Sequence, residues 1–232
     1  MSHSAKIRSI FGTAFATVCL TAVAFVPIVI STQQSPGLAA PTEAKPTQKI
    51  AQAQSPTLKN LQAAYNGESN ANVRYLAFAK KAQEEGYGQV ASLFRATARA
   101  EQIHRDNHAV VIRQMGATPQ NKIETPLVKS TKENLQEAIK GESYERDTMY
   151  PQFIAQAQKE GKKPAVRTFE FAVEAEKGHA KFYSAASNNL AAWKGGSKTF
   201  YVCPECGLTV ALIDFEKCPE CGEPKGKFEK IT

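Results

Sequence analysis

From about residue 57 to residue 193, apolar positions recur with a helical period that is interrupted at only three places. The interruptions contain Gly and Pro and fall at 86–88, 116–126 and 161–164. They separate four segments, each long enough for a helix, at 57–85, 89–115, 130–160 and 164–193. Four long helices with short connections are typical of an antiparallel bundle, and the longer gap between the second and third segments could cross one end of it. Ser130 or Thr131, with Glu133 or Asn134, is expected to cap the third helix.

The first 55 residues follow a different pattern. Lys6 and Arg8 precede a run without charged residues, 10–30, and a polar stretch rich in Pro and Ala continues to about residue 56. A signal peptide has a basic start, an apolar core and a small-residue cleavage site, which 51–53 or the neighbourhood of 39–40 could supply. The run is also long enough to cross a bilayer, which needs about 20 apolar residues.

Both interpretations of this segment place the rest of the chain outside the cytoplasm, because the basic residues precede the apolar run. The run is long and the better cleavage site lies far from it, so we favour a retained membrane anchor through 10–30. We therefore expect a membrane-anchored or exported protein. Its parts would be a signal or anchor segment with a linker, a helical domain and a small C-terminal domain, at 1–55, 56–194 and 198–232.

The composition suits a globular protein, because 42% of the residues are hydrophobic. The formal net charge of +7 is modest, and basic and acidic residues alternate along the helical region, as in Lys80-Lys81 and Glu84-Glu85. No basic stripe with interleaved aromatic residues is present. The charge pattern therefore indicates a solvated surface of mixed sign and excludes a nucleic-acid partner.

Two of the four expected helices repeat one spacing of chemically active residues. The second helix contains Glu101-x-x-His104 and the fourth contains Glu176-x-x-His179. Residues three positions apart lie on the same face of a helix, so each pair can direct a carboxylate and an imidazole at one point. The first and third helices each offer one glutamate within a Gly-Glu-Ser sequence, namely Glu68 and Glu142.

One glutamate from each of two helices, with Glu-x-x-His from the other two, is the ligand set of di-iron and di-manganese carboxylate bundles. Carboxylate oxygens can bridge two metal ions, and imidazole suits iron. Four buried carboxylates without cations would be costly. Glu68 precedes Glu101 by 33 residues and Glu142 precedes Glu176 by 34, which indicates an internal repeat. Solvated glutamates and core histidines would not produce six matching positions in this order.

Three further residues extend this pattern. Glu145 follows Glu142 by three residues, so the third helix has a second carboxylate on the same face. Tyr75 and Tyr150 follow Glu68 and Glu142 by about two helical turns. A tyrosine hydroxyl at this spacing could hydrogen-bond a ligand carboxylate, although an amphipathic core aromatic is the alternative.

Four of the five cysteines form two Cys-Pro-Glu-Cys-Gly sequences near the C-terminus, and Cys19 stands apart in the N-terminal run. The paired spacing of Cys203, Cys206, Cys218 and Cys221 indicates a tetrahedral metal site instead of a disulfide framework. A segment of this size cannot bury enough apolar surface to fold alone, so a bound metal is expected to stabilise it. Tetrahedral thiolate sites hold either zinc or iron.

Together, the two Glu-x-x-His motifs, the additional glutamates and the cysteine pairs resemble rubrerythrin over nearly all of residues 57–232. The resemblance implies a mostly α fold, in which a ferritin-like four-helix bundle precedes a small rubredoxin-like domain of strands and loops. It also implies iron at both sites, a di-iron centre in the bundle and one iron in the four-cysteine site.

The resemblance further implies a role for each metal-site residue. Glu101 and Glu176 would bridge the two irons, while Glu68 and Glu142 would be terminal ligands. His179 would bind one iron, and the other would exchange between Glu145 and His104 as its oxidation state changes. Tyr75 and Tyr150 would act beside the ligands and, with Glu145 and His104, form the catalytic set.

The activity that the resemblance implies is reduction of hydrogen peroxide to water in oxidative-stress defence, with electrons from a partner redox protein relayed through the cysteine iron. Members of the family typically form homodimers. Two alternatives are a ferroxidase or iron-handling protein, against which the appended cysteine module argues, and a non-enzymatic electron-transfer or zinc-binding scaffold. The family is usually cytoplasmic, so the N-terminal segment departs from its pattern.

Overall fold

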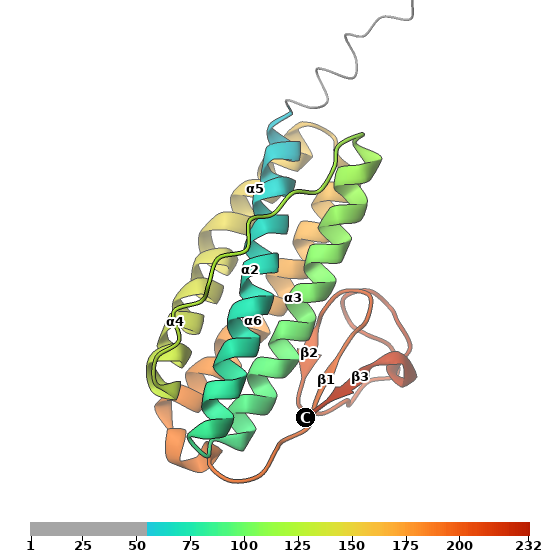
Figure 1. The fold of residues 1–232 in the computed structure, drawn as a ribbon. Helices are drawn as coiled ribbons and strands as arrows, with labels where there is room; N and C mark the ends of the chain where they lie inside the picture. The colour runs from blue at the N-terminus through green and yellow to red at the C-terminus, as the bar shows by residue number, and fades with distance from the viewer. Residues whose placement is uncertain (1–54) are drawn as a thin grey trace, which may run out of the picture. The chain divides into compact units, whose positions relative to one another are not determined.

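The protein, for which a computed structural model was obtained, is described here over residues 55–232 (Figure 1). The long helices α2, α3 and α6 run side by side with a fourth, interrupted helical segment that contains α4 and α5. Their bounds are Pro56–Glu84 for α2, Gly88–Gln114 for α3, Thr131–Tyr144 for α4, Tyr150–Lys159 for α5 and Lys163–Asn188 for α6. This arrangement confirms the predicted four-helix bundle.

A small antiparallel sheet follows the bundle and completes the predicted fold class. Its strands have the order β2-β1-β3, with bounds Phe200–Val202 for β1, Thr209–Val210 for β2 and Glu229–Ile231 for β3. The strands are very short, and loops that carry the cysteines make up most of this module. The sheet packs against α3 and α6, the two helices that contain the Glu-x-x-His motifs.

Two helix starts show why the sequence folds locally as it does. At the start of α2, the Ser55 hydroxyl accepts a hydrogen bond from the Leu58 amide, and Pro56 occupies the first helical position, where no N–H is needed. At the start of α4, Ser130 and Glu133 form a reciprocal capping box, as the sequence predicts.

The third helical segment differs from the single helix expected over 130–160. A π-helical turn, Glu145–Met149, separates α4 from α5, and the Tyr150 amide donates to the Glu145 carbonyl oxygen. Pro151 explains the interruption, because proline has no N–H and its ring would clash with the carbonyl of Asp147 in a regular α-helix. Such wide turns are frequent at functional sites, and this one contains the predicted site residue Glu145.

The connection between α3 and α4 is held in an extended path along α2 by a ladder of side-chain amides. Gln62 bonds the backbone of Thr118 and Gln120, Asn66 accepts from the Lys122 amide, and Asn70 bonds Lys122 and Glu124. Residues four apart on a helix and two apart on an extended chain both advance by about 6–7 Å, so the two spacings match. The side-chain amides of α2 thereby supply the backbone hydrogen bonds that a neighbouring strand would otherwise give to this extended segment.

No helix within residues 55–232 is long and apolar enough to cross a bilayer. This finding corrects the expectation of a membrane-anchored or exported protein. The run at 10–30, to which both the anchor and the signal peptide were assigned, lies outside the described residues.

Candidate metal centres

Six residues of the bundle bring their ligand atoms together in two overlapping groups, which we call the carboxylate centre. The first group contains Glu68, Glu101, His104 and Glu176, and the second contains Glu101, Glu142, Glu176 and His179. Within each group the ligand atoms lie within 4.8 Å of one another. Glu101 and Glu176 belong to both groups, which is the arrangement that two bridging carboxylates require.

Both histidines direct Nδ1 towards the carboxylates. His104 Nδ1 lies 2.8 Å from Glu101 Oε2 and 3.3 Å from Glu176 Oε1. His179 Nδ1 lies 2.9 Å from Glu176 Oε2 and 3.2 Å from both Glu101 Oε1 and Glu142 Oε2. The two rings lie with their centroids 6.4 Å apart, one from α3 and one from α6.

The other ring nitrogen of each histidine faces the C-terminal module. His104 Nε2 lies 3.2 Å from the Cys206 carbonyl oxygen, and His179 Nε2 lies 3.2 Å from the Thr209 hydroxyl oxygen. A carbonyl oxygen can only accept, so His104 carries its proton on Nε2 when neutral and leaves Nδ1 free for a metal. Such a partner on the distal nitrogen fixes the tautomer and orientation of a metal-binding histidine.

The electrostatics of the carboxylate centre fit bound cations. All six residues are at most 1% exposed. Burial and neighbouring carboxylates raise the pKa of Glu68 and Glu176 well above the ordinary value. Burial alone would raise the pKa of Glu101 as well, but His179 and His104 lower it to about 2. Burial would lower the pKa of His179, but Glu101 and Glu142 raise it to about 10.

A carboxylate oxygen without a hydrogen-bond partner is a second indication that the carboxylate centre binds cations. Glu68 Oε2 is buried and has no hydrogen-bond partner within residues 55–232. A buried polar atom without a partner is costly, and two divalent cations would satisfy it and offset the repulsion among the carboxylates. The donor set of four carboxylates and two imidazoles suits iron.

The two predicted tyrosines each bond a glutamate that belongs to only one ligand group and lies in the other half of the repeat. Tyr75 on α2 donates to Glu142 Oε1, and Tyr150 on α5 donates to Glu68 Oε1. Both tyrosines are buried, and they belong to different apolar clusters. The carboxylate centre is thus held from two sides of the bundle core.

Glu145 lies beside the carboxylate centre, in the π turn. Neither of the two ligand groups found within residues 55–232 includes it. Burial, followed by the charges of Glu142 and Glu101, raises the pKa of Glu145 well above its ordinary value. The charges of two glutamates of the centre thus act on the Glu145 carboxyl group, which completes neither ligand group.

Two buried side chains, each one helical turn after a ligand histidine, were not among the predicted site residues. His108 follows His104 and lies 3.2 Å from the Tyr150 hydroxyl, and Tyr183 follows His179 and pairs with the Thr97 hydroxyl. Burial lowers the pKa of His108 to about 3, so the imidazole is neutral at pH 7. The spacing of four from each histidine was the available signal, because it places both residues on the ligand face.

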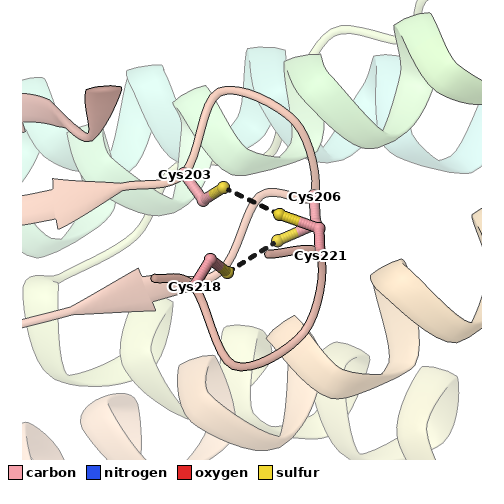
Figure 2. Close-up of side chains that lie close together, drawn as sticks. All are labelled: Cys203, Cys206, Cys218 and Cys221. Atoms are coloured by element: carbon pink, nitrogen blue, oxygen red, sulfur yellow. Dashed lines mark hydrogen bonds between the residues drawn. The ribbon is translucent and has the colours of Figure 1, made fainter. Parts of the chain in front are cut away.

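The four predicted cysteines converge on one point of the C-terminal module, as Figure 2 shows. Cys203 Sγ lies 3.5 Å from Cys221 Sγ, and Cys206 Sγ lies 3.6 Å from Cys218 Sγ. All four thiols are free, and these separations far exceed a disulfide length. They approach the edge of about 3.8 Å expected for four sulfurs bound about 2.3 Å from one metal.

The module docks on the bundle through polar and apolar contacts. Arg99 on α3 forms a bidentate ion pair with Glu229 on β3, at 2.6 and 2.7 Å. Asn107 donates to the Glu205 carbonyl oxygen at 2.8 Å, and the Phe182 and Phe200 rings meet edge to face. These contacts hold the first cysteine pair against His104.

Comparisons with known proteins identify the family. A family model described as Rubrerythrin matches residues 59–187, more than half of the chain. Nigerythrin of Nitratidesulfovibrio vulgaris is 44% identical over 173 residues, which cover 74% of this chain and 85% of that protein. Rubrerythrin-2 of Clostridium acetobutylicum is 38% identical over 172 residues, which cover 73% of this chain and 93% of that protein.

Solved structures agree with these relatives. Nigerythrin in a mixed-valent state matches with a TM-score of 0.69 and 39% identity, over 83% of this chain and 91% of that chain. A bacterioferritin of Desulfovibrio desulfuricans matches with a TM-score of 0.57 over 62% of this chain and 84% of its own, and at 21% identity it shows the fold alone. The family match and the fit of both donor sets to iron lead to one conclusion: this chain is a di-iron redox protein with an additional four-cysteine iron site, and it belongs to the rubrerythrin family.

Proposed function

We propose that the protein is a peroxidase that reduces hydrogen peroxide to two water molecules, consuming two electrons and two protons. The observation that carries this proposal is the contact between the two iron sites. The Cys206 carbonyl oxygen lies 3.2 Å from His104 Nε2, so one hydrogen bond joins a ligand of the cysteine site to a ligand of the carboxylate centre. Such a short connection favours a redox relay from one site to the other.

Membership of the two groups supports the proposed ligand roles. Glu101 and Glu176 would bridge, because both groups contain them. Glu68 with His104 would complete one iron position, and Glu142 with His179 the other. Two ferrous ions held in this way would supply the two electrons that the reaction requires.

The protein side chains around the centre hold the ligands and exclude water. Tyr75 and Tyr150 fix the terminal glutamates through their hydroxyl groups. The burial of all six ligands keeps bulk water from the reacting oxygens and strengthens electrostatic interactions. Glu145, in the wide turn, would exchange with His104 as a ligand, since its carboxyl group lies near the centre but outside both groups.

The cysteine module would receive electrons from a partner redox protein. It also supplies the hydrogen-bond partners of both histidines, the Cys206 carbonyl and the Thr209 hydroxyl. The module therefore has a structural role at the carboxylate centre in addition to relaying electrons. The contact that supports this relay lies within one chain, so the relay does not need the homodimer that the family resemblance implies.

A spectroscopic titration of the purified chain tests the proposal. We expect about three irons per chain, loss of the red ferric-thiolate colour on reduction and its rapid return after one dose of hydrogen peroxide. Iron that dioxygen reoxidises as fast as peroxide does would favour the ferroxidase alternative instead. A cysteine iron that peroxide fails to reoxidise would contradict the proposed relay.

A further inference from the structure

Beyond the ligands and the two tyrosines, a chain of hydrogen bonds extends from one side of the carboxylate centre into the bundle core. Thr168 Oγ1 on α6 lies 3.0 Å from His108 Nδ1 on α3. His108 Nε2 lies 3.2 Å from the Tyr150 hydroxyl, which donates to Glu68 Oε1. Thr168, His108, Tyr150 and Glu68 are all buried, and we call them the His108 relay.

The direction of each bond in the His108 relay follows from the number of protons available. Tyr150 has one hydroxyl proton, which it donates to the Glu68 carboxylate. His108 must therefore donate from Nε2 to the tyrosine oxygen, because that oxygen has no second proton to give. A neutral His108 then has a lone pair on Nδ1, which accepts the proton of the Thr168 hydroxyl.

The other half of the carboxylate centre has no equivalent of this relay within residues 55–232. Tyr183 occupies the position that corresponds to His108, four residues after the ligand histidine. Its hydroxyl pairs with Thr97, while its ring meets the Tyr75 ring edge to face at a centroid distance of 5.6 Å. Tyr75 therefore bonds Glu142 without a histidine donor on its hydroxyl; the Arg74 guanidinium lies over its ring instead, 5.5 Å from the ring centroid.

We propose that His108 is a positioning residue that, by donating to Tyr150, strengthens the tyrosine's hydrogen bond to Glu68 and makes the two iron positions chemically unequal. Hydrogen bonds in a chain polarise one another, so a donor to the Tyr150 oxygen makes the Tyr150 proton a better donor. A more strongly bonded Glu68 gives less negative charge to its iron. The iron beside Glu68 and His104 is therefore the easier of the two to reduce.

The test is an EPR-monitored reductive titration of the full-length protein loaded with iron, without peroxide. The proposal rests on the ligand assignment given above and not on the oxidant, so a failed peroxidase assay would leave it standing. His108→Leu removes the donor and should shift the first reduction step of the carboxylate centre to lower potential, which reduces the range over which the mixed-valent signal persists. His108→Gln keeps an amide N–H near the position of Nε2 and should restore the range.

The decisive measurement combines these substitutions with Tyr150→Phe, which removes the hydroxyl that links His108 to Glu68. In that background His108→Leu should cause no further shift, as expected for two residues that act through one bond. An equal shift in both backgrounds, or no shift in either, would overturn the proposal. Thr168→Val, which removes the donor to Nδ1 with little change of shape, should shift the potential in the same direction and replaces His108→Leu if that variant does not fold.

Tyr183→Phe is the matched control. It removes the hydroxyl at the corresponding position of the other half but retains the ring that packs against Tyr75. The potentials should remain at the wild-type values. A shift as large as that of His108→Leu would indicate a general packing effect and would also overturn the proposal.

Discussion

Gly207 packs directly on His104, because a Cβ atom added to this glycine would lie 2.3 Å from His104 Nε2. Gly207 also has a φ angle of +78°, a conformation that favours glycine. It follows Cys206 in the first cysteine pair, so the turn that holds the metal is also the turn that touches the carboxylate centre. A single substitution at Gly207 is therefore expected to move the cysteine site away from His104.

Gly207→Ala should slow the transfer of electrons between the two sites, because the added methyl group must push the cysteine turn away from His104. Stopped-flow spectroscopy of the reduced protein mixed with peroxide would measure the return of the red colour. Gly222→Ala is the matched control, since Gly222 has a φ angle of +82° but, within residues 55–232, no atom of a neighbouring residue lies within 4 Å of an added Cβ. Both variants bear a backbone strain of about 1–2 kcal/mol. Equal rates in the two would contradict the proposed route.

Glu145→Ala should lower peroxide turnover by roughly 10- to 100-fold, the range typical for loss of a group that supports a metal site. The iron content should change little, because Glu145 belongs to neither ligand group found within the described residues. Steady-state peroxide consumption and iron analysis measure the two effects. Glu137→Ala, at an exposed position of α4, should leave both unchanged. Unchanged turnover in Glu145→Ala would exclude the exchange role.

The ion pair between Arg99 and Glu229 should make the docking of the cysteine module sensitive to acid. Arg99 lowers the pKa of Glu229, so the pair stabilises the folded state above the ordinary glutamate pKa of about 4.3. This contribution is lost as the pH falls through the lowered value. Because the pair is partly exposed, Glu229→Gln should cost no more than about 1 kcal/mol at pH 7 and progressively less as the pH falls through the lowered pKa of Glu229.

Urea unfolding of Glu229→Gln and wild type, at a series of pH values from 7 downwards, measures this difference. Glu216→Gln is the control, because its pair with Lys225 is more exposed and lies within the C-terminal module. The same pH-dependent loss of stability in both variants would show that the Arg99 pair is not specific to docking.

Asn70→Ala should loosen the extended connection between α3 and α4. Asn70 makes two of the bonds of the amide ladder, to the Lys122 carbonyl oxygen and to the Glu124 amide. Each net hydrogen bond contributes about 0.5–1.5 kcal/mol, and exposure places these at the lower end, so we expect a loss of about 1 kcal/mol. Urea unfolding and proteolysis of the connection measure the effect. Lys122→Ala, which keeps the backbone partners, should leave both at wild-type values.

Much of the fold can be predicted from the sequence, because local sequence patterns determine where the helices begin and end. The apolar period and the Gly and Pro breaks predict the long helices to within one or two residues at most ends, and the capping box at Ser130 and Glu133 is correct. The two Glu-x-x-His spacings bring the expected ligands to one centre, since residues three apart share a helix face. The π turn before Pro151 was missed, because the helical period alone does not show where a turn widens.

The chain by itself thus determined the residue types at both iron sites and the helices that present them, because spacing within one helix is a local property. Only the tertiary structure decided which groups meet across helices. It joined each tyrosine to the glutamate of the opposite half, and it brought His108 between Thr168 and Tyr150. It also placed Cys206 against His104, because the packing of the module on α3 and α6 depends on contacts between residues far apart in the sequence.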